Sequence, residues 1–220
     1  MPALERLPLF PLANVVLFPG VQTPLHVFEP RYRQMTEHAL AGDRRIGMVV
    51  VLPGHLERMP EDPPVFEIGC EGAITDAQQL PNGRFNIVLQ GTQRFRIVRE
   101  GARADGRLYR VAEIEKLEEP FDPVARPRVI ALRHRAIELA AELTAAQSSR
   151  PALTPEAFRN IDDVTFVNAL SNAFALATAE KQSLLEAASI PERYERLVSI
   201  LGFQAAERRH LAAPPSDAIH

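Results

Sequence analysis

The sequence has very few of the residues that cross-link a protein or anchor it in a membrane. Among its 220 residues there is one cysteine, Cys70, and no tryptophan. A single cysteine excludes an internal disulfide, so the chain is not a disulfide-stabilised secreted scaffold. The first residues lack the basic start and continuous apolar segment of a signal peptide, and no apolar run approaches the ~20 residues that span a bilayer. We therefore expect a soluble, cytoplasmic protein.

An excess of charge of one sign is also lacking. The 25 Lys and Arg residues and the 28 Asp and Glu residues are interspersed and leave a net charge of −3. Proteins that bind nucleic acid non-specifically carry a clear excess of positive charge. We expect neither DNA nor a membrane among the partners, although a local cluster of arginines is compatible with this total.

No motif of an enzyme active site is present. The segment GARADGR, residues 101–107, has the glycine spacing of a phosphate-binding P-loop, but Arg107 and Leu108 stand where a P-loop has Lys followed by Ser or Thr. The segment also lies between two expected strands, so we interpret it as a hairpin turn. No G-x-G-x-x-G follows a strand, and no G-x-S-x-G occurs. The six histidines form no H-x-x-x-H pair. The sequence predicts no catalytic residue, no cofactor and no metal site.

Two residues keep an enzymatic alternative open. His26 lies between Leu25 and Val27, where a histidine is more often a hydrogen-bonded structural residue than a catalyst. Cys70 lies in an expected strand without a basic neighbour to activate its thiol, so we interpret it as a packed residue. An enzyme would require these two side chains, or either one with a carboxylate, to meet in a cleft.

Proline and short apolar segments dominate the start of the chain. Residues 7–32, LPLFPLANVVLFPGVQTPLHVFEPRY, contain five prolines, so the chain has to be extended until Pro30. Asn14 and Pro19-Gly20 supply turns, and the apolar pieces between them predict short strands at residues 9–12, 15–18 and 25–28. If Leu25 and Val27 point inward, His26 and Phe28 point outward.

The next segments alternate between helical and strand patterns. Pro30 opens a helix at residues 30–41, and Gly42 occupies the position of a left-handed cap. The inward face of this helix is expected to consist of Tyr32, Met35, Ala39 and Leu40. Further strands are predicted at residues 45–52, 65–75, 84–91, 94–100 and 108–117. The proline-rich segment 53–64 is expected to be a mobile surface loop.

After residue 119 the pattern becomes helical. Apolar residues at three- and four-residue spacing predict a long helix from Val129 to about Gln147, with Asp122 as a candidate cap before it. Shorter helices are expected after Thr154, after Asp162 or Asp163, after Thr178 and from Pro191. We therefore expect three parts: a β-rich subdomain at residues 1–119, a helical bundle at 120–211 and a disordered tail at 212–220.

Several short motifs occur in an order that is typical of one family. They are the Pro-Leu-Phe-Pro-Leu start, Phe18-Pro19-Gly20, Phe28-Glu29-Pro30-Arg31-Tyr32, and Gly91 with Arg94-Phe95. With these motifs the chain resembles, from about Leu7 to Ala205, the LON substrate-binding domain, the N-terminal domain of ATP-dependent Lon proteases. The resemblance implies an α+β fold in which a β-rich PUA-like pseudo-barrel with one helix precedes a helical bundle. In the full protease this region helps to select unfolded or damaged substrates and supports oligomerisation.

The resemblance and the lack of catalytic motifs favour a stand-alone, non-enzymatic protein without ATPase or protease modules. It would bind exposed apolar polypeptide or a partner protein, such as a protease or a chaperone. The opening stretch has more apolar side chains than one face of a short strand requires, so the candidate contacts are Phe10, Phe18, His26 and Phe28.

An alternative is a PUA-like barrel that holds a small ligand or single-stranded RNA. Its contacts would be arginines on neighbouring strands, namely Arg84, Arg94, Arg96 and Arg99. Arginines that alternate with apolar residues are also typical of the ordinary solvent face of a half-buried strand.

Overall fold

The structure is a computed structural model that describes residues 4–103, 106–119, 122–145, 158 and 160–212. Contacts divide the chain into two compact units, residues 1–119 with 168–186 and residues 120–167 with 187–220. Residues 168–186 thus group with the strands, whereas the sequence pattern assigns all of residues 120–211 to one helical bundle. The start of the helix expected after Thr154 and the tail after Ala212 lie outside the described residues.

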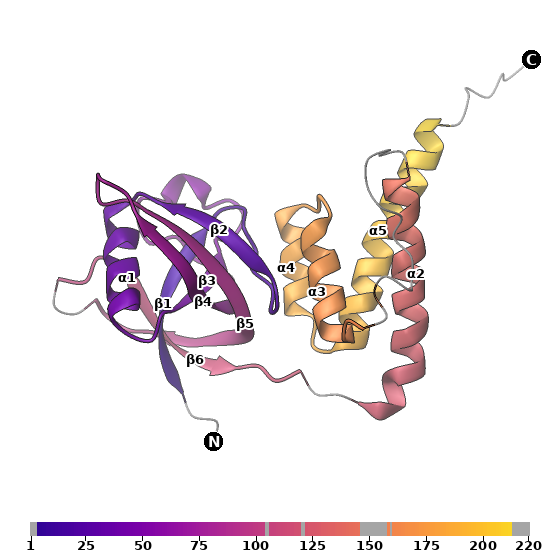
Figure 1. The fold of residues 1–220 in the computed structure, drawn as a ribbon, viewed down its shortest axis with the longest axis horizontal. Helices are drawn as coiled ribbons and strands as arrows, with labels where there is room; N and C mark the ends of the chain where they lie inside the picture. Colours follow the sequence, from indigo (N-terminus) through magenta and orange to yellow (C-terminus); the bar gives the residue numbers. More distant parts are fainter. Residues whose placement is uncertain (1–3, 104–105, 120–121, 146–157, 159, 213–220) are drawn as a thin grey trace, which may run out of the picture. The chain divides into compact units, whose positions relative to one another are not determined.

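Six strands form one sheet, with the bounds Glu5–Leu12 (β1), Gln22–Val27 (β2), Arg45–Val50 (β3), Ile68–Gln79 (β4), Phe85–Glu100 (β5) and Arg110–Lys116 (β6). The strand order is β2-β5-β4-β3-β1-β6, and β5 also pairs with β6. This last pairing closes β5, β4, β3, β1 and β6 into a ring (Figure 1). The pairing of β1 with β3 is parallel, and the other pairings of these strands are antiparallel. The expected β-rich pseudo-barrel is confirmed.

The longest strand, β5, makes the closure possible. One of its edges pairs with β4, and the other pairs first with β2 and then with β6. The predicted division into two strands with a bend at Gly91 is wrong, because a bulge against β4, between Glu71 and Gly72, absorbs the irregularity and the strand continues. Gly91 is needed for another reason. A Cβ atom at this position would lie 2.1 Å from the carbonyl oxygen of Phe18, so the backbone before Pro19 passes directly over the strand.

The opening stretch contains two strands instead of three. Residues 15–18 are not part of a strand, although Val16, Leu17 and Phe18 are buried. The chain here crosses β5 instead of lengthening the sheet. The amide of Gly20 donates to the carbonyl oxygen of Gly91 at 2.9 Å, and the amide of Gly91 donates to that of Val21 at 2.8 Å.

The described α-helices are Pro30–Ala41 (α1), Arg126–Thr144 (α2), Asp163–Ala173 (α3), Thr178–Glu186 (α4) and Ile190–Ala212 (α5). The predicted bounds of α1 are confirmed, and Tyr32, Met35 and Ala39 are buried as expected. The predicted cap is wrong, since Gly42 has a φ of −116°. Arg44, with a φ of 61°, takes the left-handed position two residues later, and its amide donates to the carbonyl oxygen of Ala39 at 2.9 Å.

The ring of strands encloses an apolar core. Its central cluster consists of Leu7, Leu9, Val49, Phe95, Ala112 and Ile114, which come from β1, β3, β5 and β6. Phe95 occupies space that Gly69 leaves open, because a Cβ atom there would lie 2.7 Å from its ring. The core therefore depends on strands that are far apart in the sequence.

Buried amide side chains fasten the second half of α3 and α4 to the barrel. Asn168 donates to the carbonyl oxygen of Pro19 at 3.1 Å, and Gln182 donates to that of Ile68 at 3.0 Å. Both side chains are buried, so the loss of either would leave a backbone carbonyl without this partner. These bonds explain why residues 168–186 group with the strands.

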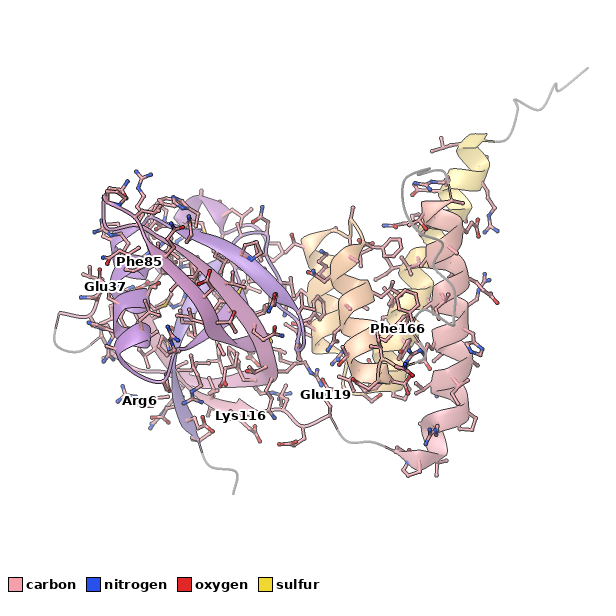
Figure 2. All side chains as sticks on the ribbon, viewed as in Figure 1. Arg6, Glu37, Phe85, Lys116, Glu119 and Phe166 are labelled. Atoms are coloured by element: carbon pink, nitrogen blue, oxygen red, sulfur yellow. The ribbon has the colours of Figure 1, made fainter. Side chains whose placement is uncertain are left out.

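The second unit contains α2, the first turn of α3 and α5. Phe166, labelled in Figure 2, stacks on Tyr194 of α5 with ring centroids 6.4 Å apart, and the guanidinium of Arg133 lies 4.3 Å over the Phe166 ring. Arg133 also pairs with Asp163 at 2.7 Å. Asp162 caps α3, since its carboxylate accepts a backbone hydrogen bond at 2.9 Å.

Candidate functional site

The first two candidate contacts, Phe10 and Phe18, are part of the core. Phe10 is 4% exposed and packs against Tyr32 with ring centroids 4.4 Å apart, and Phe18 is fully buried. Burial raises the pKa of Tyr32 to about 12, so this side chain stays neutral. The expectation that Phe10 and Phe18 line a surface groove is corrected here, because both rings are buried and Phe10 packs against Tyr32 of α1.

The other two candidates, His26 and Phe28, lie together on the surface. Burial alternates along β2, with Val27 buried and His26 exposed, and Phe28 just beyond the strand is 58% exposed. The two rings are stacked, with centroids 6.1 Å apart and planes at 25°. A hydrogen bond of 2.8 Å joins His26 Nδ1 to Asn86 Oδ1 on β5, directly opposite in register. The predicted inward and outward directions in β2 are therefore confirmed.

This pair can supply contact area for a ligand, and His26 lies far from Cys70, the other residue of the enzymatic alternative. Cys70 is buried in β4 opposite Arg94, whereas His26 is opposite Asn86. The two positions on β5 are eight residues apart, or about 26 Å of strand. His26 and Cys70 therefore do not form a dyad, which is one of the two arrangements that the enzymatic alternative allows. Within the described residues, no group of three or more His, Cys, Asp or Glu side chains is arranged to hold a metal ion.

The arginines of the alternative site do not form one cationic surface. Arg94 is buried and donates hydrogen bonds to the carboxylate of Glu119 at 2.6 Å and to the carbonyl oxygen of Leu185 at 2.7 Å. Glu119 is labelled in Figure 2. Arg99 forms two hydrogen bonds of 2.8 Å with Glu113, and this contact lowers the pKa of the Glu113 carboxyl. The cations at 94 and 99 thus have carboxylate partners. Arg84 and Arg96 are exposed.

A network of charged side chains joins the start of β1 to β3 and β6. Glu5 accepts a hydrogen bond from Arg45 at 2.6 Å and pairs with Lys116, labelled in Figure 2, at 3.0 Å. Arg45 also contacts Asp43 at 2.8 Å and the buried Glu71 at 3.3 Å. Hydrogen bonds to Arg45 and Lys116 hold the pKa of Glu5 below its usual range. Opposite charges are matched here, so the network ties strands together.

The free edge of β2 is the feature that the sequence did not reveal. Among the described residues, β2 pairs with β5 alone, and no backbone hydrogen bond reaches its other edge. A signal was present in the sequence, because proline inside a sheet is confined to edges, strand starts and bulges. Pro24 lies in the middle of β2, opposite Val88. An exposed aromatic pair therefore adjoins a strand edge with unpaired backbone groups.

Comparison with known proteins identifies the family. The family model described as the ATP-dependent protease La (LON) substrate-binding domain matches residues 6–202. The chain belongs to this family. The LON substrate-binding domain thus includes the barrel, α1 and most of the described helical residues.

Curated relatives of this LON domain are Lon proteases. It is 29% identical over 191 residues to the Lon protease of Flavobacterium johnsoniae, an alignment that covers 85% of this chain and 22% of the relative. It is 28% identical over 196 residues to the Lon protease of Cytophaga hutchinsonii, with coverage of 89% and 24%. The chain therefore spans about a quarter of the length of these relatives, in the region of their substrate-binding domain.

Solved structures confirm the α+β fold. The Lon N-terminal domain protein of Xanthomonas campestris matches with a TM-score of 0.60 and 24% identity, over 89% of this chain and 98% of that one. The N-terminal domain of Mycobacterium avium complex Lon protease matches with a TM-score of 0.65 and 19% identity, over 90% and 98%. Within the described part of the chain, no helix combines the length and apolar character needed to cross a membrane.

Proposed function

We propose that this LON domain binds exposed apolar segments of unfolded polypeptide, or such a segment of a partner protein, and does so in the cytoplasm without catalysing a reaction. The observation that carries the proposal is the stacked pair of His26 and Phe28, because Phe28 exposes more than half of its surface beside a second ring. A large aromatic side chain gives much contact area for little loss of conformational freedom. Family membership supports the same class of ligand.

The test is a titration of a permanently unfolded, fluorescently labelled polypeptide, followed by fluorescence anisotropy. We expect saturable binding, and we expect Phe28→Ala to weaken it roughly tenfold, which corresponds to about 1.4 kcal/mol of binding free energy. Folding of the variant should be unaffected because the side chain is exposed.

A matched control exists on α5. Phe203 is 65% exposed, so Phe203→Ala removes the same side chain from a similarly exposed position in the second unit. This variant should bind like the unmodified chain. Absence of saturable binding at high micromolar concentration would reject the proposed function, and equal losses in the two variants would reject the surface at Phe28.

A further inference from the structure

The backbone of β2 offers hydrogen bonds that no described part of the chain uses. The strand has six residues, and in the described structure it pairs only with β5. A sheet edge of this kind is a template for another extended chain. We propose that a client polypeptide binds this domain as an added strand along the free edge of β2, next to His26 and Phe28. The proposal rests on the function proposed above and specifies its ligand as an extended backbone.

The register shows which backbone groups face outward. The amide of Gly91 donates to the carbonyl oxygen of Val21, so Val21 is a position that bonds to β5. Along an antiparallel strand, successive residues direct their N–H and C=O groups alternately to one neighbouring strand and to the other side. Thr23, Leu25 and Val27 therefore direct these groups toward β5, as Val21 does. Gln22, Pro24 and His26 direct their backbone groups to the free edge.

Pro24 gives the same assignment independently. Proline has no amide hydrogen, so a continuous ladder with β5 requires that its nitrogen face away from that strand. The free edge accordingly presents the N–H and C=O groups of Gln22 and His26 and the C=O group of Pro24. Two donors and three acceptors can be used by an added strand, and the missing central donor keeps such binding weak and reversible.

The missing donor also favours a client over a second copy of this chain. Antiparallel pairing of two β2 strands would place two prolines near the centre of the contact, and donors would be missing on both sides. A client segment without proline loses only one bond. The side chains of His26 and Pro24 lie on the exposed face of β2, and Phe28 follows, so an apolar client side chain on that face meets an aromatic surface.

The decisive experiment uses one labelled peptide in three backbone forms. The peptide has a single phenylalanine among serine and threonine residues, so that the phenylalanine fixes its register against Phe28. One form is unmodified, the second is N-methylated at odd positions and the third at even positions. Only alternate amides of an added strand face the edge, so we expect one methylated form to bind at least tenfold more weakly and the other to bind within about twofold of the parent.

The outcomes separate this inference from the proposed function. If the unmodified peptide does not bind while an unfolded protein does, or if both methylated forms bind alike, strand addition is wrong and apolar binding stands. If neither the peptide nor the unfolded protein binds, both proposals fail. Self-association of the unmodified protein that the peptide does not compete away would assign the edge to a second copy and overturn the inference.

A substitution in the protein should strengthen peptide binding, whereas N-methylation of the peptide weakens it. Pro24→Val restores the central donor on the free edge without removing a bond to β5, so peptide binding should tighten about threefold. His26→Pro removes one of the remaining donors and should weaken binding about threefold or more. The gain in the first variant cannot arise from misfolding, and unchanged or weaker binding by a folded Pro24→Val protein would contradict the proposal.

Discussion

Residues 7–18 and β2 both belong to the proline-containing opening stretch but occupy different places in the barrel unit. The first segment has Pro8 and Pro11 in an almost wholly apolar sequence, and β2 has Pro24 in a sequence that mixes polar and apolar residues. The first segment contains most of β1, which has β3 on one side and β6 on the other. It then crosses β5 with residues 16–18 buried. β2 is paired on one side and exposes alternate side chains. The difference shows that proline predicts extended backbone in both segments, while the number of neighbouring strands and the presence of polar residues distinguish a core strand from an edge strand.

The largest expected effect compares Phe18 with Phe28. Phe18→Ala removes a fully buried ring and should destabilise the domain by about 4 kcal/mol, whereas Phe28→Ala should change the free energy of unfolding by less than about 0.5 kcal/mol. Urea denaturation followed by circular dichroism measures both. Equal destabilisation by the two substitutions would show that Phe28 belongs to the core and would remove it from the candidate surface.

A somewhat smaller effect is expected at the crossing over β5. Gly91→Ala places a Cβ atom 2.1 Å from the Phe18 carbonyl oxygen, a backbone atom that cannot rotate away, and should cost about 3 kcal/mol. Gly101→Ala is the control, since the nearest atoms there lie 3.7 and 3.8 Å from the new Cβ. A Gly91→Ala protein as stable as the control would mean that residues 15–18 are free to move off the strand.

Local patterns predicted the elements that depend on neighbours in the sequence. Proline at position 30 and the spacing of Tyr32, Met35 and Ala39 were enough to predict α1 within its bounds. Gly91 was misinterpreted because glycine signals both a turn and a close approach of two backbones, and only the position of Phe18 distinguishes them. The parallel pairing of β1 with β3 and the closure between β5 and β6 join distant segments, for which no local pattern exists.

The candidate surface was also predicted only in part, because some of its features depend on local patterns and others on contacts between distant segments. Alternation in β2 correctly placed His26 and Phe28 outward, because side-chain direction in a strand is a local property. Burial of Phe10 depends on Tyr32 in α1, and that of Phe18 on where the chain crosses β5. Neither contact is encoded near those residues in the sequence.

Low pH should reduce the hydrogen-exchange protection at the start of β1 and leave that of β2 unchanged. The pKa of Glu5 is lowered in the folded protein by hydrogen bonds to Arg45 and Lys116, so this contribution to stability is complete above the usual pKa of 4.5 and is lost as the pH falls through the lower folded value. The carboxylate is partly exposed, so the contribution is below about 1 kcal/mol. Hydrogen exchange at pH 3 against pH 6, corrected for intrinsic rates, should show a loss of protection at β1 that Glu5→Gln abolishes. A change confined to β2 would contradict this account.

Salt concentration should have the smallest effect, on the affinity for unfolded polypeptide. Its effect tests whether the surface at β2 binds its ligand without ionic contacts. Binding through backbone groups, His26 and Phe28 involves few fixed charges, so polypeptide affinity should change less than about twofold between about 50 and about 200 mM salt. RNA held by the exposed Arg84 and Arg96 would instead lose affinity steeply over this range, because each phosphate contact releases a bound cation. An anisotropy titration of both ligands across the range separates the cases. Affinity for RNA that falls steeply with salt and is reduced by Arg96→Gln, together with no binding of unfolded polypeptide, would assign the binding function to Arg84 and Arg96 instead of the edge of β2.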